Sequence, residues 1–203
     1  MGWYADRVLP ALIARGMENK QMTKYRPLVP SLASGRVLEV GLGTGLNLEH
    51  YGDEVTHVFG LEPARKLLEQ AAERAERAAF EVDLIEAGAE AIPLEDASVD
   101  TVVTTWTLCS IQDLDTALSE IRRVLKPAGR LLFLEHGRAP DAGVARWQDR
   151  LTPLSRPLLG CSLNRPMDRL IDAAGFRFSE LRKEYFDGPR FISYHYVGQA
   201  QPR

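Results

Sequence analysis

The residues best suited to chemistry lie in one short stretch, LEVGLGTGLN, at residues 38–47. Gly41, Gly43 and Gly45 occupy alternate positions there, directly after an apolar run that contains Glu39. Glycine allows a tight turn and lets a ligand approach the backbone, so the loop is typical of nucleotide binding. We expect Glu39 at the mouth of the loop, where its carboxylate would repel a pyrophosphate. The acid and the spacing therefore favour an adenosyl ligand with a positively charged end, such as S-adenosylmethionine.

A second acid, Glu62, ends the next apolar run, roughly 20 residues after the first glycine of the loop. A carboxylate at that point accepts hydrogen bonds from the two ribose hydroxyls of a nucleotide. Enzymes that use nicotinamide dinucleotides share this feature, so Glu62 alone does not discriminate between ligands. The discriminating feature is Glu39 together with the shortened glycine spacing.

The elements that must position these residues follow a repeating pattern. Apolar runs predict strands at residues 36–40, 55–62, 80–87, 99–108 and 129–136. Helical patterns predict a helix that begins at residue 46 and further helices at 64–79, 114–126 and 166–176. Two alternating stretches, 176–186 and 190–200, predict a terminal hairpin that turns at Asp187, Gly188 and Pro189. The pattern predicts an α/β fold with a doubly wound, mostly parallel seven-stranded sheet, helices on both faces and one antiparallel strand near the edge.

The length of 203 residues fits a single domain, which we divide into four segments. Residues 1–34 form an N-terminal helical segment, in which Val8, Leu12 and Ile13 share one face. We expect residues 35–137 to be the cofactor-binding core. Residues 139–166 contain four prolines and read as a substrate-side insertion lying over the sheet. A C-terminal helix and hairpin fill residues 167–203.

Composition excludes several classes of protein. A formal net charge of -3 gives no reason to expect a nucleic-acid partner. Two cysteines cannot build a disulfide framework or fill a four-ligand zinc site, so we expect no metal and a reducing, cytoplasmic location. We see no signal peptide or membrane span, and peripheral membrane contact is the less favoured use of the first helix. The expected partner is a small-molecule acceptor, and the oligomeric state is open.

The motifs together resemble those of class I S-adenosylmethionine-dependent methyltransferases. The match consists of Glu39 to Gly45, the ribose-binding acid Glu62, and the stretches EAGAEAIPLEDASVDTVV and RRVLKPAGRLLFLE. It covers roughly residues 35 to 137, with Ala128 in place of a usual second glycine. The resemblance implies that S-adenosylmethionine is the cofactor and S-adenosylhomocysteine the product. The implied cofactor-binding residues are Glu39, Gly41, Gly43, Gly45, Asn47, Glu62, Pro63, Gly88, Ala89, Glu90, Thr105 and Trp106.

A narrower resemblance covers most of the chain. The stretches LCS, EHGRAP, RWQDRL and LLGCSLNR are similar, in order, to the methyltransferase-like thiol S-methyltransferases. Members of that family in animals are membrane-anchored and methylate hydrogen sulfide and alkyl thiols. We expect this chain to lack such an anchor and to be a soluble relative, whose acceptor could differ.

Methyl transfer from a sulfonium is an in-line displacement, in which the enzyme mainly aligns the two reactants. A thiol, with a pKa of about 8.5, needs less help from a base than an amine or a phenol. A site with few candidate bases therefore favours a sulfur acceptor. The candidate base is His136, at the end of the strand predicted for residues 129–136. An equally good interpretation is that this histidine only holds the insertion in place by a hydrogen bond. Candidates for the acceptor pocket are Tyr25, Cys109, Trp147, Arg165 and Tyr185, each with a structural role as the alternative.

The sequence therefore predicts a methyltransferase that acts on a small, fairly apolar acceptor, with a thiol as first choice. A lipid amine or a quinone-like acceptor is the alternative within the same class. Two other classes stay open at this point. One is a nicotinamide-dependent oxidoreductase, which Glu39 disfavours, and the other is a module that binds S-adenosylmethionine without turnover.

Overall fold

A computed structural model describes residues 20–203 of the chain. The predicted amphipathic helix with Val8, Leu12 and Ile13 lies outside the described residues. The described part begins with the short helix α2 (Lys20–Tyr25) and two 3-10 turns, η2 (Arg26–Leu28) and η3 (Pro30–Leu32), and these lead into the sheet.

The sheet has seven strands in the order β3-β2-β1-β4-β5-β7-β6. Strands β1 to β5 pair in parallel, and β7 runs antiparallel to both of its neighbours, β5 and β6. This confirms the predicted mostly parallel sheet with one reversed strand near its edge. The strands are β1 (Gly35–Val40), β2 (Val55–Leu61), β3 (Glu81–Ile85), β4 (Val99–Thr105), β5 (Leu125–His136), β6 (Phe176–Tyr185) and β7 (Tyr194–Pro202).

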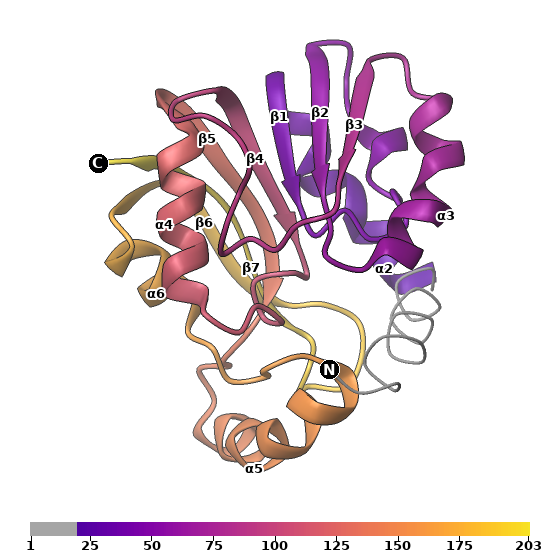
Figure 1. The fold of residues 1–203 in the computed structure, drawn as a ribbon. Coiled ribbons are helices and arrows are strands. Elements are labelled where there is room, and N and C mark those ends of the chain that lie inside the picture. The colour runs from indigo at the N-terminus through magenta and orange to yellow at the C-terminus, as the bar shows by residue number, and fades with distance from the viewer. Residues whose placement is uncertain (1–19) are drawn as a thin grey trace.

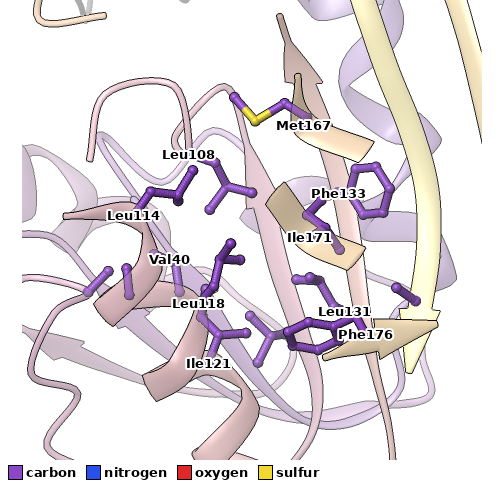
Figure 2. Packing of buried hydrophobic residues seen from close by; sticks show 14 of the residues in the cluster. Val40, Leu108, Leu114, Leu118, Ile121, Leu131, Phe133, Met167, Ile171 and Phe176 are labelled. Carbon is purple, nitrogen blue, oxygen red and sulfur yellow. The ribbon is translucent and has the colours of Figure 1, made fainter. Parts of the chain in front are cut away.

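Helices cover both faces of the sheet, as predicted (Figure 1). They are α3 (Arg65–Glu76), α4 (Leu114–Val124) and α6 (Met167–Ala173), while a further helix, α5 (Ala142–Leu159), is described below. Helices α4 and α6 pack on one face, where Leu118, Ile121, Met167, Ile171 and Phe133 belong to one fully buried cluster (Figure 2). Burying such side chains stabilises the fold by roughly 1.5–3 kcal/mol each.

Helix α3 and the N-terminal turns cover the opposite face. Leu68 and Ala71 of α3 pack there against Val37, Val58 and Val103. Successive side chains of a strand point to opposite faces, so Val37 and Leu38 of β1 belong to different clusters. The same alternation places Glu39 on the α3 face, which decides its surroundings below.

Two expected elements differ between sequence and structure near the site. The helix expected from residue 46 is only the 3-10 turn η4 (Leu48–His50). The chain must return within a few residues to begin β2 at Val55, and the side chains of Asn47 and Tyr51 are held by Glu39. The strand expected to reach residue 108 ends at Thr105, because Trp106 adopts a left-handed backbone with a φ of 52°.

The insertion is also placed differently. Residues 142–159 form one helix, α5, with Pro153 and Pro157 inside it. This helix lies beyond the edge at which the parallel strands end, and not over a face of the sheet (Figure 1). Gln148 explains the placement, because its buried amide group bonds to the backbone of Gly137 and Ala139, just after β5.

Candidate functional site

The glycine-rich turn leads from β1 to η4, and its backbone depends on glycine. Gly41 has a φ of 77°, and a Cβ atom there would lie 2.3 Å from Oγ1 of Thr107. Gly43 has a φ of 59°, and a Cβ atom there would have no neighbour within 4 Å. Side chains rarely adopt this left-handed conformation. Packing against Thr107 therefore explains why Gly41 is a glycine. At Gly43 the space beside the backbone is open and can admit a ligand.

A cavity of about 500 Å³ lies against this turn, at the carboxyl ends of the parallel strands. Its volume falls in the range of sites that hold nucleotide-sized ligands. Eight of the twelve predicted cofactor residues line it: Gly41, Gly43, Glu62, Pro63, Gly88, Ala89, Glu90 and Trp106. The structure thus brings together residues that follow four strands, β1, β2, β3 and β4.

Glu62 lies in the cavity wall directly after β2 and is held by two backbone groups. Its Oε2 accepts a hydrogen bond from the amide of Gly43 at 3.1 Å, and its Oε1 accepts one from Ala64 at 3.0 Å. Burial raises the pKa of the carboxyl group, and these two bonds partly offset the rise. Each oxygen can accept further bonds, which suits the pair of hydroxyls of a ribose.

Glu39 lies behind the glycine turn and not at its mouth. It is 1% exposed, does not line the cavity, and both of its oxygens are engaged. Asn47 Nδ2 donates to Oε1 at 2.7 Å, and the Tyr51 hydroxyl donates to Oε2 at 2.8 Å. Burial raises the pKa of Glu39 to about 7, although both bonds and the Arg26 charge act in the opposite direction. The difference from the expectation arises because Glu39 faces α3 and the N-terminal turns.

Asn47 joins Glu39 to its surroundings. Its Nδ2 also donates to Oγ1 of Thr105 at 3.0 Å, and its Oδ1 accepts a bond from the Arg26 guanidinium at 2.9 Å. Glu39, Gly45, Asn47 and Thr105 are the four predicted cofactor residues outside the cavity lining. They form the layer that supports the turn, and their expected contact with the cofactor stays a prediction.

Trp106 closes one side of the cavity in a strained conformation. A left-handed backbone at a residue other than glycine costs on the order of 1–3 kcal/mol, so surrounding contacts must hold it. Its backbone N–H donates to Leu134 at 2.8 Å, and its indole N–H donates to Nε2 of His195 at 2.9 Å. The Arg26 guanidinium lies 5.3 Å from the centre of the indole ring. Burial lowers the pKa of His195 to about 4, which keeps this acceptor neutral at pH 7.

His136, the candidate base, ends β5 and does not line the cavity. Its Nδ1 is buried and has no hydrogen-bond partner among the described residues. The imidazole lies near the thiol of Cys161. The neighbouring Cys109 thiol and burial raise the pKa of Cys161 well above its usual value, while the nearby His136 acts in the opposite direction. The role of His136 as a base stays a prediction.

The five residues predicted for the acceptor pocket do not gather around the cavity. Trp147 is 59% exposed on α5, and Cys109 is buried. The Arg165 guanidinium donates to the backbone carbonyls of Leu108 and Ile111, so it holds the loop after β4.

The two tyrosines of this predicted pocket are held by other contacts. The Tyr185 hydroxyl bonds to Asp141. Tyr25 stacks on Phe186, with ring centres 3.8 Å apart, and bonds to Asp187. A common acceptor pocket for the five residues is therefore not present in this arrangement.

The loop after Trp106 forms a part of the cavity wall that was not predicted. Thr107, Ser110, Ile111 and Gln112 line the cavity there. The β-branched run before Trp106 contains no glycine or proline that would signal a turn at residue 106. The only available signal was position, because loops at the carboxyl ends of parallel strands line ligand sites.

The lining residues fit S-adenosylmethionine better than a dinucleotide. Glu62 and Glu90 are the charged residues among them, and the lining contains no Lys or Arg that could neutralise a diphosphate. Leu61, Leu67 and Ile111 offer apolar surface for an adenine ring. No metal would be needed, and within residues 20–203 no group of His, Cys, Asp and Glu side chains is arranged to bind one.

Comparison with known proteins agrees with this chemistry. Residues 38–133 match the family model described as a methyltransferase domain. The thiol S-methyltransferase TMT1B of Rattus norvegicus is 33% identical over 208 residues, covering 97% of this chain and 84% of that protein. The thiol S-methyltransferase TMT1A of Homo sapiens is 32% identical over 215 residues, covering 98% and 87%.

Other similarities are shorter or concern the fold alone. A ubiquinone/menaquinone biosynthesis C-methyltransferase of Methylobacterium nodulans is 34% identical over 62% of this chain and 51% of its own length. A phosphatidylethanolamine N-methyltransferase of Cereibacter sphaeroides is 33% identical over 50% and 51%. A crystal structure of an S-adenosylmethionine-dependent methyltransferase from Thermotoga maritima, a possible histamine N-methyltransferase, has a TM-score of 0.69 at 19% identity, over 98% of this chain and 97% of that chain.

Among residues 20–203, no helix is both long and apolar enough to cross a membrane.

Proposed function

Because this chain belongs to the family of S-adenosylmethionine-dependent methyltransferases that includes the thiol S-methyltransferases TMT1A and TMT1B, we propose that it methylates a small, fairly apolar thiol. The observation that carries the choice of a thiol is the extent of the similarity. The relatives named as thiol S-methyltransferases align over 97% and 98% of the chain. Their match therefore includes α5 and the C-terminal hairpin, outside the common methyltransferase domain.

In this proposal the cavity beside the glycine turn holds S-adenosylmethionine, which supplies a methyl group already activated by a sulfonium. Glu62 accepts hydrogen bonds from the ribose hydroxyls, and the bare backbone of Gly43 allows close approach. Gly88, Ala89 and Ile111 contact the adenine region. Glu90 adds a second negative charge to the wall, which favours a cationic ligand over an anionic one.

The acceptor enters beside Trp106 and the loop formed by residues 107–112. Thr107, Ser110 and Gln112 offer neutral polar groups to it, and Trp106 and Ile111 offer apolar surface. A thiol ionises with a pKa of about 8.5, so a usable fraction is thiolate near neutral pH without a strong base. The main task of these residues is then alignment and exclusion of water.

A radiolabelled methyl-transfer assay over thiols, amines and phenols tests this proposal. We expect turnover of small apolar thiols, with a rate that rises with pH towards the pKa of the thiol. Robust amine methylation without thiol methylation would contradict it. Calorimetry with S-adenosylmethionine, S-adenosylhomocysteine and a nicotinamide dinucleotide is the companion measurement, and the two adenosyl ligands should bind more tightly.

Two partial relatives favour a second candidate function. The quinone C-methyltransferase and the phosphatidylethanolamine N-methyltransferase share 34% and 33% identity with parts of this chain. A quinone-like or lipid-amine acceptor is accordingly the alternative. The same assay separates it from the first choice, provided that both acceptors are included.

His136 is the proposed base if the acceptor needs one. Its place at the carboxyl end of β5, the edge of the sheet that carries the cavity, is the observation in favour. His136→Asn should then lower the rate most strongly at a pH below the pKa of the acceptor thiol. An equal change in rate at all pH values would assign His136 a structural role only.

We further propose that the acceptor is a free small molecule, and that the protein works in the cytoplasm. The formal charge of -3 offers little attraction for nucleic acid. The free cysteines Cys109 and Cys161 suit a reducing compartment. Cell fractionation checks the location.

A further inference from the structure

His195 connects the C-terminal hairpin to the wall of the cofactor cavity. Its Nε2 lies 2.9 Å from the indole Nε1 of Trp106, and its Nδ1 lies 2.8 Å from the carbonyl oxygen of Ser193. An indole N–H can only donate and a carbonyl can only accept, so both partners require the proton on Nδ1 and a lone pair on Nε2. The two contacts thus define one neutral tautomer of His195.

The imidazole is itself held in place. It is 6% exposed, and the Phe186 ring stacks on it with the ring centres 4.2 Å apart. The carbonyl of Ser193 also accepts the backbone N–H of Phe186 at 2.8 Å, which closes the hairpin at this point. Tyr25 stacks on the other side of Phe186. His195 is therefore a rigid acceptor whose orientation is fixed before any ligand binds.

Strand direction explains why a residue so late in the chain reaches this place. Strand β7 runs antiparallel to β5, and His195 pairs with His136 at the carboxyl end of β5. The start of β7 consequently meets the edge of the sheet where Trp106 follows β4. Trp106 needs such support because its backbone is left-handed and its indole forms part of the cavity lining.

We propose that His195 is a positioning residue for methyl transfer, because its Nε2 lone pair holds the Trp106 indole as a wall of the cofactor cavity. The proposal rests on the use of that cavity for S-adenosylmethionine. The alternative role of His195 is simple packing between Phe186 and Trp106. The two roles differ in one respect, since packing needs a ring at this position and positioning needs an acceptor.

Two substitutions separate these roles. His195→Gln replaces the ring but can place an oxygen acceptor near the position of Nε2. His195→Phe keeps an aromatic ring that can stack on Phe186 and removes the acceptor. Both are made in a chain with Trp3 and Trp147 replaced by Phe, so that Trp106 is the remaining tryptophan of the sequence and its fluorescence reports its own surroundings.

The measurements are the affinity for S-adenosylhomocysteine by calorimetry, the emission maximum of Trp106, and the KM and kcat for S-adenosylmethionine. For His195→Phe we expect about a tenfold weaker affinity, a shifted emission and a higher KM with a smaller change in kcat, because a buried N–H loses its partner. For His195→Gln we expect an affinity within about threefold of the parent.

Parent-like affinity and emission in a folded His195→Phe variant would overturn the proposal, as would an equal loss in His195→Gln. If His195→Phe does not fold, His195→Asn takes its place, because the shorter side chain cannot reach the indole. The Asn variant should show the same tenfold loss, and parent-like binding by it would again overturn the proposal. Failure of the parent protein to bind either adenosyl ligand would instead overturn the proposed function, and this inference with it.

Discussion

At the scale of single residues, the two buried acids beside the glycine turn have different surroundings and therefore different expected roles. Glu62 faces the cavity and keeps acceptor capacity for a ligand. Glu39 faces inward and already receives bonds from Asn47 and Tyr51. The sequence places both acids near the ligand. It does not show which face of β1 packs against α3, and in the structure Glu39 lies on that face.

Glu62→Gln tests the role of the first acid. The variant should bind S-adenosylhomocysteine roughly 10- to 100-fold more weakly, because hydrogen bonds to a charged group contribute about 1.5–3 kcal/mol. Calorimetry measures the affinity, and Glu69→Gln, an exposed position on α3, is the matched control. Affinity within twofold of the wild type for Glu62→Gln would remove Glu62 from the ribose site.

The first two glycines of the turn should respond differently to alanine. Gly41→Ala brings a methyl group to 2.3 Å from Thr107, so we expect a loss of about 1–3 kcal/mol in the free energy of unfolding. Gly43→Ala meets no neighbour, so its effect on stability should be near the cost of a left-handed alanine, about 1 kcal/mol.

For cofactor affinity we expect the opposite order, with the larger effect in Gly43→Ala. The methyl group at position 43 projects into open space beside the cavity, and we expect it to weaken cofactor affinity more than it weakens the fold. Urea denaturation and calorimetry on both variants provide the comparison. A Gly43→Ala protein with unchanged affinity would mean that no ligand approaches this backbone.

At the scale of elements, the loop after β4 is the part of the site that the sequence concealed. Apolar and β-branched runs predict the core strands well, because burial of those side chains is what forms the sheet. The turn at Trp106 depends instead on tertiary partners, chiefly Leu134 and His195, which lie far along the chain. Side-chain bonds also decide η4, where Asn47 and Tyr51 bond to the nearby Glu39 and the expected helix does not form.

Arg165 provides a test of this loop. Arg165→Ala leaves the carbonyls of Leu108 and Ile111 without their donor, so we expect a loss of roughly 1–3 kcal/mol in stability. Because Ile111 and its neighbours line the cavity, affinity for S-adenosylhomocysteine should fall too.

Arg169→Ala is the matched control for that experiment, since it removes an exposed arginine four residues away. Arg165→Lys should recover part of the loss, because a single ammonium group replaces the fork that bonds both carbonyls. A less stable Arg165→Ala protein with normal affinity would show that the position of the loop does not govern binding.

At the scale of the whole molecule, Glu39 should link stability to pH. Its pKa is about 7 in the folded protein, against an ordinary value of 4.5, and the main cause is burial. The folded state therefore holds this proton more tightly than the unfolded state. The stability that the proton provides is fully present below about pH 4.5 and is lost as the pH rises through 7.

Denaturation of the wild type and Glu39→Gln between pH 5 and 8 measures this link. The stability of the wild type relative to the variant should fall by an amount on the order of 3 kcal/mol as the pH rises across that window. The comparison removes the contribution of His195, whose lowered pKa has the opposite sign. Parallel stability curves for the two proteins would contradict the raised pKa.

The reversed strand has one more consequence, for the handling of the protein. Because β7 begins at the edge where the parallel strands end and runs back along β5, residue 203 lies on the side of the molecule away from that edge (Figure 1). A fluorescent reporter or a solid support attached after Arg203 would lie on the side of the molecule remote from the cavity beside the glycine turn. Enzyme immobilised through that end should admit donor and acceptor as freely as enzyme in solution.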